Sequence, residues 1–411
     1  MKPEPAPSLP TAPDSLLHRA FVAFWFADVA ASFGFQMVSV ALGWQIYSVT
    51  GRAFDLGLIG LVQFVPSMVL ALPAGHVADR FERRRIVLCG QIVECVAIAM
   101  LTALTLLHGA NESGILALVF VVSVARAFEF PAMQSMLPAL VPAALLPRAM
   151  AATASAGEAA MIVGPAFGGL LYVAGPGVVY AVAAALYLVS VVLLGRIRHV
   201  QARVEREPAT MKTVFAGVHF IRRRPDVLGV ISLDLFAVLL GGATALLPIF
   251  AKDILHTGPW GLGLLRAAPA AGALLMSLWL ARYTMQKRVG LTMYAAVAGF
   301  GVATVVFAVS TTLWLSLAAL FALGALDMVS VVIRGALVQL DTPDEMRGRV
   351  SAVNAIFINT SSQLGEFESG MAAAWLGAVQ ATLLAGIGTL LVVGLWMMMF
   401  PTLRRRQSLQ A

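Results

Sequence analysis

Residues 75–85, GHVADRFERRR, place six charged side chains between two long apolar stretches of the chain. The stretches at 56–75 and 86–108 each have about 20 or more mostly apolar residues, the length that an α-helix needs to cross a bilayer. Only helices and closed barrels satisfy their backbone hydrogen bonds inside a membrane, and these stretches are too long and continuous for barrel strands. The sequence therefore predicts a helical hairpin with a short, basic loop.

The pattern of this hairpin extends along the whole chain. Of the 411 residues, 60% are hydrophobic and 12% are charged, whereas soluble domains carry roughly 25% charged residues. We expect apolar spans at 20–49, 56–75, 86–108, 114–140, 149–174 and 177–195, and again at 226–251, 260–281, 290–310, 313–339, 346–376 and 379–400. The predicted fold is an all-α membrane protein with 12 transmembrane helices in two pseudo-symmetric six-helix bundles.

The spans also predict the division of the chain into segments. We expect a disordered, proline-rich cytoplasmic tail at 1–19, a first bundle at 20–195, a basic cytoplasmic linker at 196–225, a second bundle at 226–400 and a basic cytoplasmic tail at 401–411. If the N-terminus is cytoplasmic, only Arg52 and Lys252 among the basic residues lie in outer loops. Cytoplasmic loops keep the positive charge, so we expect a multi-pass protein of the bacterial inner membrane with both termini in the cytoplasm.

The net charge of +7 does not indicate nucleic-acid binding, because the basic residues lie in short runs between apolar spans. Cys89 and Cys95 have neither a metal-site spacing nor that of a disulfide framework. The sequence contains no phosphate-binding lysine loop, zinc motif or nucleophile elbow. We therefore expect no enzyme activity, cofactor, metal or nucleic-acid partner, and we expect a monomer.

The loop at 75–85 resembles the loop between helices 2 and 3 of the major facilitator superfamily, G-x-x-x-D-R-x-G-R-R. The matching positions are Gly75, Asp79, Arg80, Arg83 and Arg84. Glu82 stands at the second glycine of the pattern, where a turn with positive φ is therefore unfavourable. The resemblance implies that Asp79 is part of a conformational latch. Its partner would be the positively polarised N-terminus of the helix that begins after Thr342 and Pro343.

A second motif lies in the span at 149–174. Residues 160–169, AMIVGPAFGG, are similar to the superfamily's antiporter motif G-x-x-x-G-P-x-x-G-G at Gly164, Pro165, Gly168 and Gly169. Small residues at this spacing allow helices to approach closely, and Pro165 allows a bend; generic small-residue packing is the alternative interpretation. The resemblance implies export. With further matches at 40–47, 140–142 and 347–366, almost the whole chain resembles the enterobactin-exporter-like and macrolide-efflux-like group.

Ionisable side chains inside the spans are the remaining signal, because each is unfavourable in the bilayer unless it faces a cavity or a partner. They are Asp28, Glu94, Arg126, Glu129, Glu158, Asp234, Asp327, Arg334, Glu366 and Glu368. We expect proton coupling and transport to involve Asp28, Arg126, Glu129, Asp234, Asp327, Arg334 and Glu366.

Asp28 is the first candidate for the proton carrier, because it lies about nine residues into the first span, where burial disfavours a charged carboxylate. Arg126 and Glu129 are three residues apart and share a helix face, so they can partly neutralise one another. A structural ion pair and the proton-coupling arginine implied by the resemblance both remain open. Asp327 and Arg334 lie two turns apart on one face. Asp234 is the approximate counterpart of Asp28, with a structural polar contact as the alternative.

The sequence therefore predicts a secondary active transporter. The leading hypothesis is a proton-coupled antiporter that exports small amphiphilic molecules, such as siderophores or drugs, by alternating access between two bundles. Its partners would be the substrate, protons and the lipid bilayer. An uncoupled facilitator or lipid translocator of the same fold is the alternative, and its transport would ignore a pH gradient. A non-transporting receptor is a third hypothesis, which the buried charges disfavour.

Overall fold

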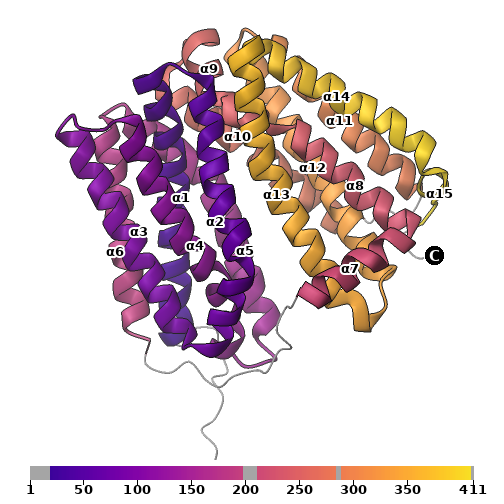
Figure 1. Ribbon diagram of the computed structural model, residues 1–411, viewed down its shortest axis with the longest axis horizontal. Coiled ribbons are helices and arrows are strands. Elements are labelled where there is room, and N and C mark those ends of the chain that lie inside the picture. The colour runs from indigo at the N-terminus through magenta and orange to yellow at the C-terminus, as the bar shows by residue number, and fades with distance from the viewer. Residues whose placement is uncertain (1–18, 198–210, 284–287, 409–411) are drawn as a thin grey trace, which may run out of the picture.

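The structure is a computed structural model that describes residues 19–197, 211–283 and 288–408. Long helices form two bundles that lie side by side (Figure 1). The first contains α1 (Arg19–Thr50), α2 (Ala53–Arg80), α3 (Arg83–Leu106), α4 (Glu112–Leu140), α5 (Leu146–Tyr172) and α6 (Pro176–Gly195). The second contains α8 (Pro225–Leu240), α10 (Gly258–Arg282), α11 (Val289–Val309), α12 (Leu313–Leu340), α13 (Asp344–Leu376) and α14 (Ala378–Met399). The short helix α15 (Pro401–Arg405) follows α14.

Eleven helical segments of the described residues are long and apolar enough to cross a membrane. α13 is the twelfth long helix. Its charged residues lower its hydropathy, but it is 33 residues long and packs against α2, α8 and α14. The predicted all-α fold of 12 transmembrane helices in two bundles is therefore confirmed.

One predicted span is not a single helix. After α8 the chain passes through a glycine pair, Gly241 and Gly242, and then through η1 (Gly242–Leu246), α9 (Leu247–Ile249) and the π-helical η2 (Phe250–Ile254). Glycine is a poor helix former and Pro248 cannot donate a backbone hydrogen bond, so a continuous helix at 226–251 is not formed. The interruption lies between α8 and α10, at one end of the second bundle.

The predicted linker contains a helix of its own. Residues 211–223 form α7 (Met211–Arg223), which packs against α8 and α13. Residues 198–210 of the linker, the predicted tail up to residue 18 and residues 409–411 lie outside the described part of the chain.

Local sequence explains several helix ends. A proline occupies one of the first two positions in several helices, where a backbone N–H would have no partner within the helix. These helices are α5, α6, α8, α10 and α15. The side chain of Asn111 caps α4 by accepting a hydrogen bond from the N–H of Gly114 at 2.8 Å. Gly377 alone separates α13 from α14, with a φ of +91° that glycine adopts readily.

The two bundles meet through α5 with α10 and through α2 with α13. We refer to the end of the bundles with Arg19, residues 81–82 and α15 as the basic face, and to the end with residues 51–52, α9 and Gly377 as the opposite face. The bundles approach each other at the end with α9 and diverge toward α7 (Figure 1).

Candidate transport site

A pair of opposite charges lies inside the first bundle. Glu94 of α3 is fully buried, and neither carboxylate oxygen has a hydrogen-bond partner among the described residues. Arg126 of α4 forms an ion pair with it, at 3.9 Å between Nη1 and Oε2. Charge-assisted hydrogen bonds are about 2.7–2.9 Å long, so this pair is loose. The buried hydroxyl of Tyr187 on α6 also lacks a hydrogen-bond partner in the described chain.

Glu129 has hydrogen-bond partners of its own. Its Oε1 accepts a hydrogen bond from Nε2 of Gln91 at 3.0 Å, and Ser190 donates to Oε1 of Gln91 at 2.5 Å. The ion-pair partner of Arg126 is Glu94 and not Glu129, which points toward α3 but lies within electrostatic range of Arg126, as expected for two groups that partly neutralise one another. The network joins α3, α4 and α6 inside the first bundle.

Asp28 lies on α1 beside these groups. It is partly exposed and within electrostatic range of Glu129 and Arg126. We name Asp28, Glu94, Arg126 and Glu129 the coupling cluster. Its three carboxyl groups lie within electrostatic range of one guanidinium, and a single positive charge cannot compensate three carboxylates in a region of low dielectric. The cluster therefore contains more acidic than basic groups inside the first bundle.

Arg126 also faces a central pocket of about 110 Å³. Its side chain is 36% exposed, and its guanidinium lies 3.7 Å from the ring centroid of Phe35. Gln63 of α2 and Gln363 of α13 contribute polar groups to a largely apolar wall. Pockets for drug-sized ligands measure roughly 300–1,000 Å³, so in this conformation the pocket has room for water or part of a ligand. Arg126 thus contacts both the buried Glu94 and the pocket, which Tyr187 also lines.

The second bundle contains a buried ion pair. Asp234 of α8 and Arg334 of α12 form a salt bridge, and their side chains are only 5% and 6% exposed. The sequence placed Arg334 on one helix face with Asp327. The structure instead pairs it with Asp234, which reaches it from the neighbouring helix, while Asp327 forms no ion pair to any described residue. This arrangement supports a structural role for Asp234.

Substitution of Asp234 by asparagine is expected to destabilise the second bundle strongly, because it leaves the Arg334 charge buried without a counter-charge. Breaking one side of a buried ion pair costs about 3–5 kcal/mol. We expect a large fall in the melting temperature of the detergent-solubilised protein in scanning fluorimetry, whereas Glu345→Gln on the exposed start of α13 should change it little. The double variant Asp234→Leu, Arg334→Met should recover most of the loss. An unchanged melting temperature for Asp234→Asn would contradict the assignment.

Glycines bring the two bundles into close contact near the opposite face. A Cβ atom added to Gly57 of α2 would lie 2.9 Å from Cα of Gly370 in α13. A Cβ added to Gly169 of α5 would likewise lie 2.9 Å from Cα of Gly263 in α10. We name these four residues the glycine seam. The antiporter-like motif therefore packs as predicted for small residues, with Gly168 against the backbone of Met37 in α1.

Polar side chains cross between the bundles in the same region. Arg266 of α10 donates a hydrogen bond to Ser39 of α1, and Tyr47 of α1 donates one to Asp253 of η2. Glu366 of α13 packs directly against Gly60 of α2. Glu366 therefore belongs to the contact between the bundles, within electrostatic range of Arg266, and not to the coupling cluster.

The helices have open space near the basic face. Added Cβ atoms at Gly75 of α2, Gly157 of α5 and Gly348 of α13 would meet nothing within 4 Å. The glycine seam and the divergence of the bundles toward α7 (Figure 1) together show that the bundles are joined at the opposite face and separated toward the basic face. If the basic face is cytoplasmic, the conformation is inward-open.

The arginines of the loop at 75–85 are anchored within their own bundle. Arg83 donates to the carbonyl of Ser135 at 3.1 Å, and Arg84 donates to the carbonyl of Gly195 at 2.7 Å. Arg80 is exposed. Glu82 has a φ of −62°, so no left-handed turn is needed there. The side chain of Asp79 lies outside the described atoms, so its latch role stays a prediction.

Comparison with known proteins identifies the family to which the chain belongs. A family model described as "Transmembrane secretion effector" matches residues 10–410. The chain belongs to this family of major facilitator transporters. The family member is accordingly a multi-pass membrane transport protein and not an enzyme.

Two curated relatives of this family member are exporters by name. The enterobactin exporter EntS of Citrobacter koseri is 26% identical over 394 residues, which cover 94% of this chain and 93% of the exporter. The multidrug efflux pump Tap of Mycolicibacterium fortuitum is 26% identical over 391 residues, covering 92% and 95% of the two chains.

Solved transporter structures share the fold of this family member. A bacterial homologue of the human lysosomal transporter Spinster superposes with a TM-score of 0.75 at 13% identity, covering 93% of this chain and 96% of that one. The nucleoside transporter NupG superposes with a TM-score of 0.73 at 12% identity, covering 93% and 99%. These similarities confirm the predicted major facilitator fold.

Glu94 is the residue of the coupling cluster that the sequence left out of the predicted site. The sequence identified it only as an ionisable residue inside a span. The sequence does contain information on this contact, because α3 and α4 are consecutive antiparallel helices and Glu94 and Arg126 each lie near the middle of their helix. Opposite charges at matching depth on neighbouring spans indicate an ion pair.

Proposed function

We propose that this family member is a proton-coupled antiporter that exports small neutral or cationic amphiphilic molecules by alternating access. We place it in a bacterial inner membrane with its basic face and both termini in the cytoplasm. The observation that carries the proposal is the position of Arg126, which contacts buried Glu94 and also forms part of the central pocket. The named functions of the two exporter relatives support export as the direction.

Arg126 links proton binding to substrate binding, so that each disfavours the other. While Glu94 is ionised, it compensates the charge of Arg126, and the pocket accepts a neutral or cationic molecule. When Glu94 takes up a proton, Arg126 keeps its charge and loses its partner, so a positive group faces the pocket and repels a cation. The loose 3.9 Å contact allows this change without breaking a strong hydrogen bond. Proton binding on one side therefore favours substrate release, as antiport requires.

Asp28 is our proposed entry point for the proton. It is partly exposed, whereas Glu94 is completely buried. Asp28 also lies within electrostatic range of Glu129 and Arg126, so a proton on Asp28 alters the charge balance of the whole cluster. We assign a supporting role to Glu129, whose bond to Gln91 fixes the geometry of the cluster.

The remaining predicted residues have other proposed roles. The buried pair of Asp234 with Arg334 stabilises the second bundle, and Glu366 contributes to closure of the opposite face. Asp327, which is partly exposed on α12, remains a second candidate for substrate contact. Asp79 and the arginines of its loop are proposed to close the basic face when the bundles rock in the other direction.

The test is dye export from reconstituted vesicles with and without an imposed pH gradient. We expect purified protein in liposomes to move the cationic dye ethidium against its concentration gradient only when a proton gradient of opposite direction is present. Asp28→Asn should reduce this uphill transport at least tenfold, because the amide cannot carry a proton. Exchange of dye across the vesicle membrane at equal concentrations should continue.

Glu368→Gln is the matched control, since it removes an exposed carboxyl group of α13 outside the cluster. It should transport like the unmodified protein. Dye movement that is equally fast with and without the pH gradient would overturn proton coupling in favour of an uncoupled facilitator. Normal uphill export by Asp28→Asn would instead remove only Asp28 from the proposal.

A further inference from the structure

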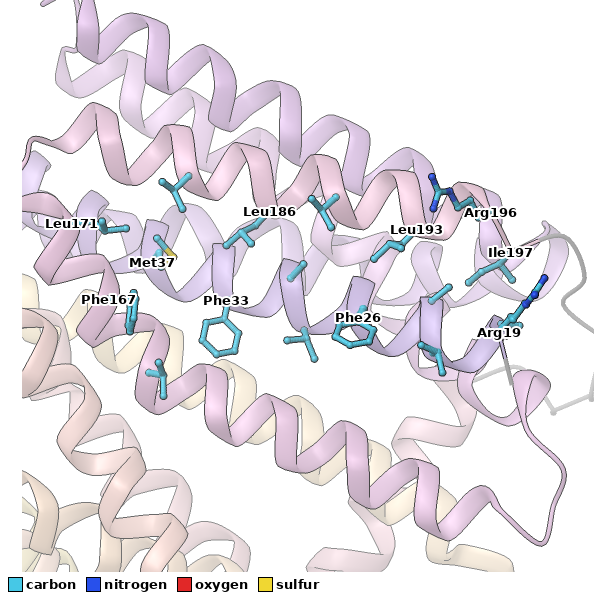
Figure 2. Close-up of a pocket in the computed structure, with 18 residues that line it drawn as sticks. Arg19, Phe26, Phe33, Met37, Phe167, Leu171, Leu186, Leu193, Arg196 and Ile197 are labelled. Carbon is cyan, nitrogen blue, oxygen red and sulfur yellow. The ribbon is translucent and has the colours of Figure 1, made fainter. Parts of the chain in front are cut away.

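A large groove lies on the outer wall of the first bundle, away from the coupling cluster. It has a volume of about 1,260 Å³ and is formed by α1, α5 and α6. Figure 2 shows Phe33 and Met37 of α1 on its floor, Phe167 of α5 on one side and Leu186 of α6 on the other. We refer to it as the outer groove. Its lining residues are apolar except at one end.

The polar end of the outer groove is formed by two arginines. Arg19 begins α1 and Arg196 follows α6, and both side chains are exposed at the basic face (Figure 2). Neither forms an ion pair with a described residue, and the lining of the groove contains no acidic side chain. The groove thus combines a long apolar surface with two positive charges at one end that no acidic residue of the described chain pairs with.

The dimensions of the outer groove match those of a membrane lipid. From Arg19 to Met37, α1 rises by roughly 27 Å at 1.5 Å per residue, close to the ~30 Å thickness of the hydrocarbon region. The part between Arg19 and Val29 covers about 15 Å, the depth of one leaflet. Small side chains on α1, Ala20 and Ala23, hollow the floor in this part.

An apolar groove inside a bilayer must be filled, because an empty one loses dispersion contacts along its walls. We propose that the outer groove binds a phospholipid with a net negative headgroup. Its acyl chain lies along α1 between α5 and α6, and its phosphate is bound by the guanidinium groups of Arg19 and Arg196. Basic residues at the cytoplasmic end of a pocket between helices recognise anionic headgroups in this way. This site is independent of the proposed transport cycle.

A second groove on the same bundle provides an internal comparison. It measures about 780 Å³ and lies between α2, α3 and α4. Its arginine, Arg85, is neutralised by Glu82 at 2.7 Å. The second groove therefore lacks an uncompensated charge in its lining, and we expect lipid to fill it without a preference for anionic headgroups.

The test is native mass spectrometry of the full chain in a mild detergent with equal amounts of phosphatidylglycerol and phosphatidylcholine of the same acyl chains. We expect the protein to retain phosphatidylglycerol preferentially. Arg19→Gln with Arg196→Gln should lower its affinity roughly 30-fold, about fivefold for each arginine. Ala23→Leu, which fills the groove floor, should lower retention of both lipids.

Arg148→Gln and Arg85→Gln are matched controls, because they remove basic residues of the same face outside the outer groove. Both should retain the preference for phosphatidylglycerol. Equal retention of the two lipids by the unmodified protein would overturn the proposal. The proposal would also be overturned if the control variants lost as much affinity for phosphatidylglycerol as the double variant, because that would indicate a general effect of surface charge. A dimer in the spectrum that dissociates in Ala23→Leu would also overturn it, by assigning the groove to a second copy.

Discussion

Replacement of Glu94 by glutamine is expected to abolish proton-driven export while leaving a folded protein that still binds substrate. The amide has nearly the same volume as the carboxyl group, so the buried position is filled in both proteins. It cannot take up or release a proton, and it permanently removes the ion-pair partner of Arg126, whose side chain is 36% exposed and can therefore be solvated, unlike that of Arg334. Uphill export of ethidium in vesicles should fall at least tenfold, to the level measured without a pH gradient.

The same substitution should weaken binding of a cation more than that of a neutral molecule. Coupling between linked sites is typically worth about 1–3 kcal/mol, which corresponds to changes of roughly 5- to 150-fold in affinity. We expect the dissociation constant for ethidium to rise within this range. The double variant Glu94→Gln, Arg126→Gln removes both charges, so it should restore ethidium binding without restoring uphill export.

Glu368→Gln serves as the control for Glu94→Gln, because Glu368 is an exposed acidic residue on a long helix of the other bundle. Its transport should be unchanged. Normal uphill export by Glu94→Gln would show that Glu94 does not couple protons to substrate. Equal losses of affinity for ethidium and for a neutral substrate would show that the charge of Arg126 does not affect binding in the pocket.

Replacement of Gly169 by valine is expected to force the opposite face open. Even the first carbon of a side chain at this position would lie 2.5 Å from the carbonyl oxygen of Pro259 and 2.9 Å from Cα of Gly263. Both are backbone atoms, which cannot rotate away. Overpacking costs about 1–3 kcal/mol, so the ratio of open to closed conformations should shift by roughly 5- to 150-fold. Transport should fall, because each cycle needs the closed state as well as the open one.

Pulsed electron resonance can measure this shift. Spin labels on cysteines introduced at Val49 of α1 and Trp260 of α10, with Cys89 and Cys95 replaced, report the distance across the opposite face. We expect a longer distance in Gly169→Val. Gly157→Ala is a control on the same helix, because an added Cβ there meets no atom within 4 Å. An unchanged distance in Gly169→Val would contradict the glycine seam as the closing contact.

The helical spans could be predicted from sequence because hydropathy and length are local properties. The exceptions have identifiable causes. The break after α8 depends on Gly241 and Gly242, which lie in an apolar stretch and leave its hydropathy unchanged. α13 carries more charged and polar residues than the other long helices, and its length and its packing against α2, α8 and α14 place it in the second bundle.

The site was harder to predict, because ion pairing depends on which helices are neighbours. Arg126 and Glu129 lie three residues apart, which makes them candidates for a pair within α4. In the folded chain α3 presents Glu94 to Arg126 and Gln91 to Glu129. The same is true of Arg334, whose ion-pair partner Asp234 lies on α8 and not on the helix of Arg334. Sequence spacing identifies the candidates, and tertiary packing selects the partners.

The glycine seam has a consequence for the electrical insulation of the membrane. Protons cross a bilayer through continuous chains of water, and the seam leaves α2 touching α13 and α5 touching α10 at the level of the backbone. Such contacts have no room for a water chain between them. A resting transporter of this shape therefore blocks passive proton current, and seam variants should be recognisable by a rise in vesicle conductance even when no substrate is present.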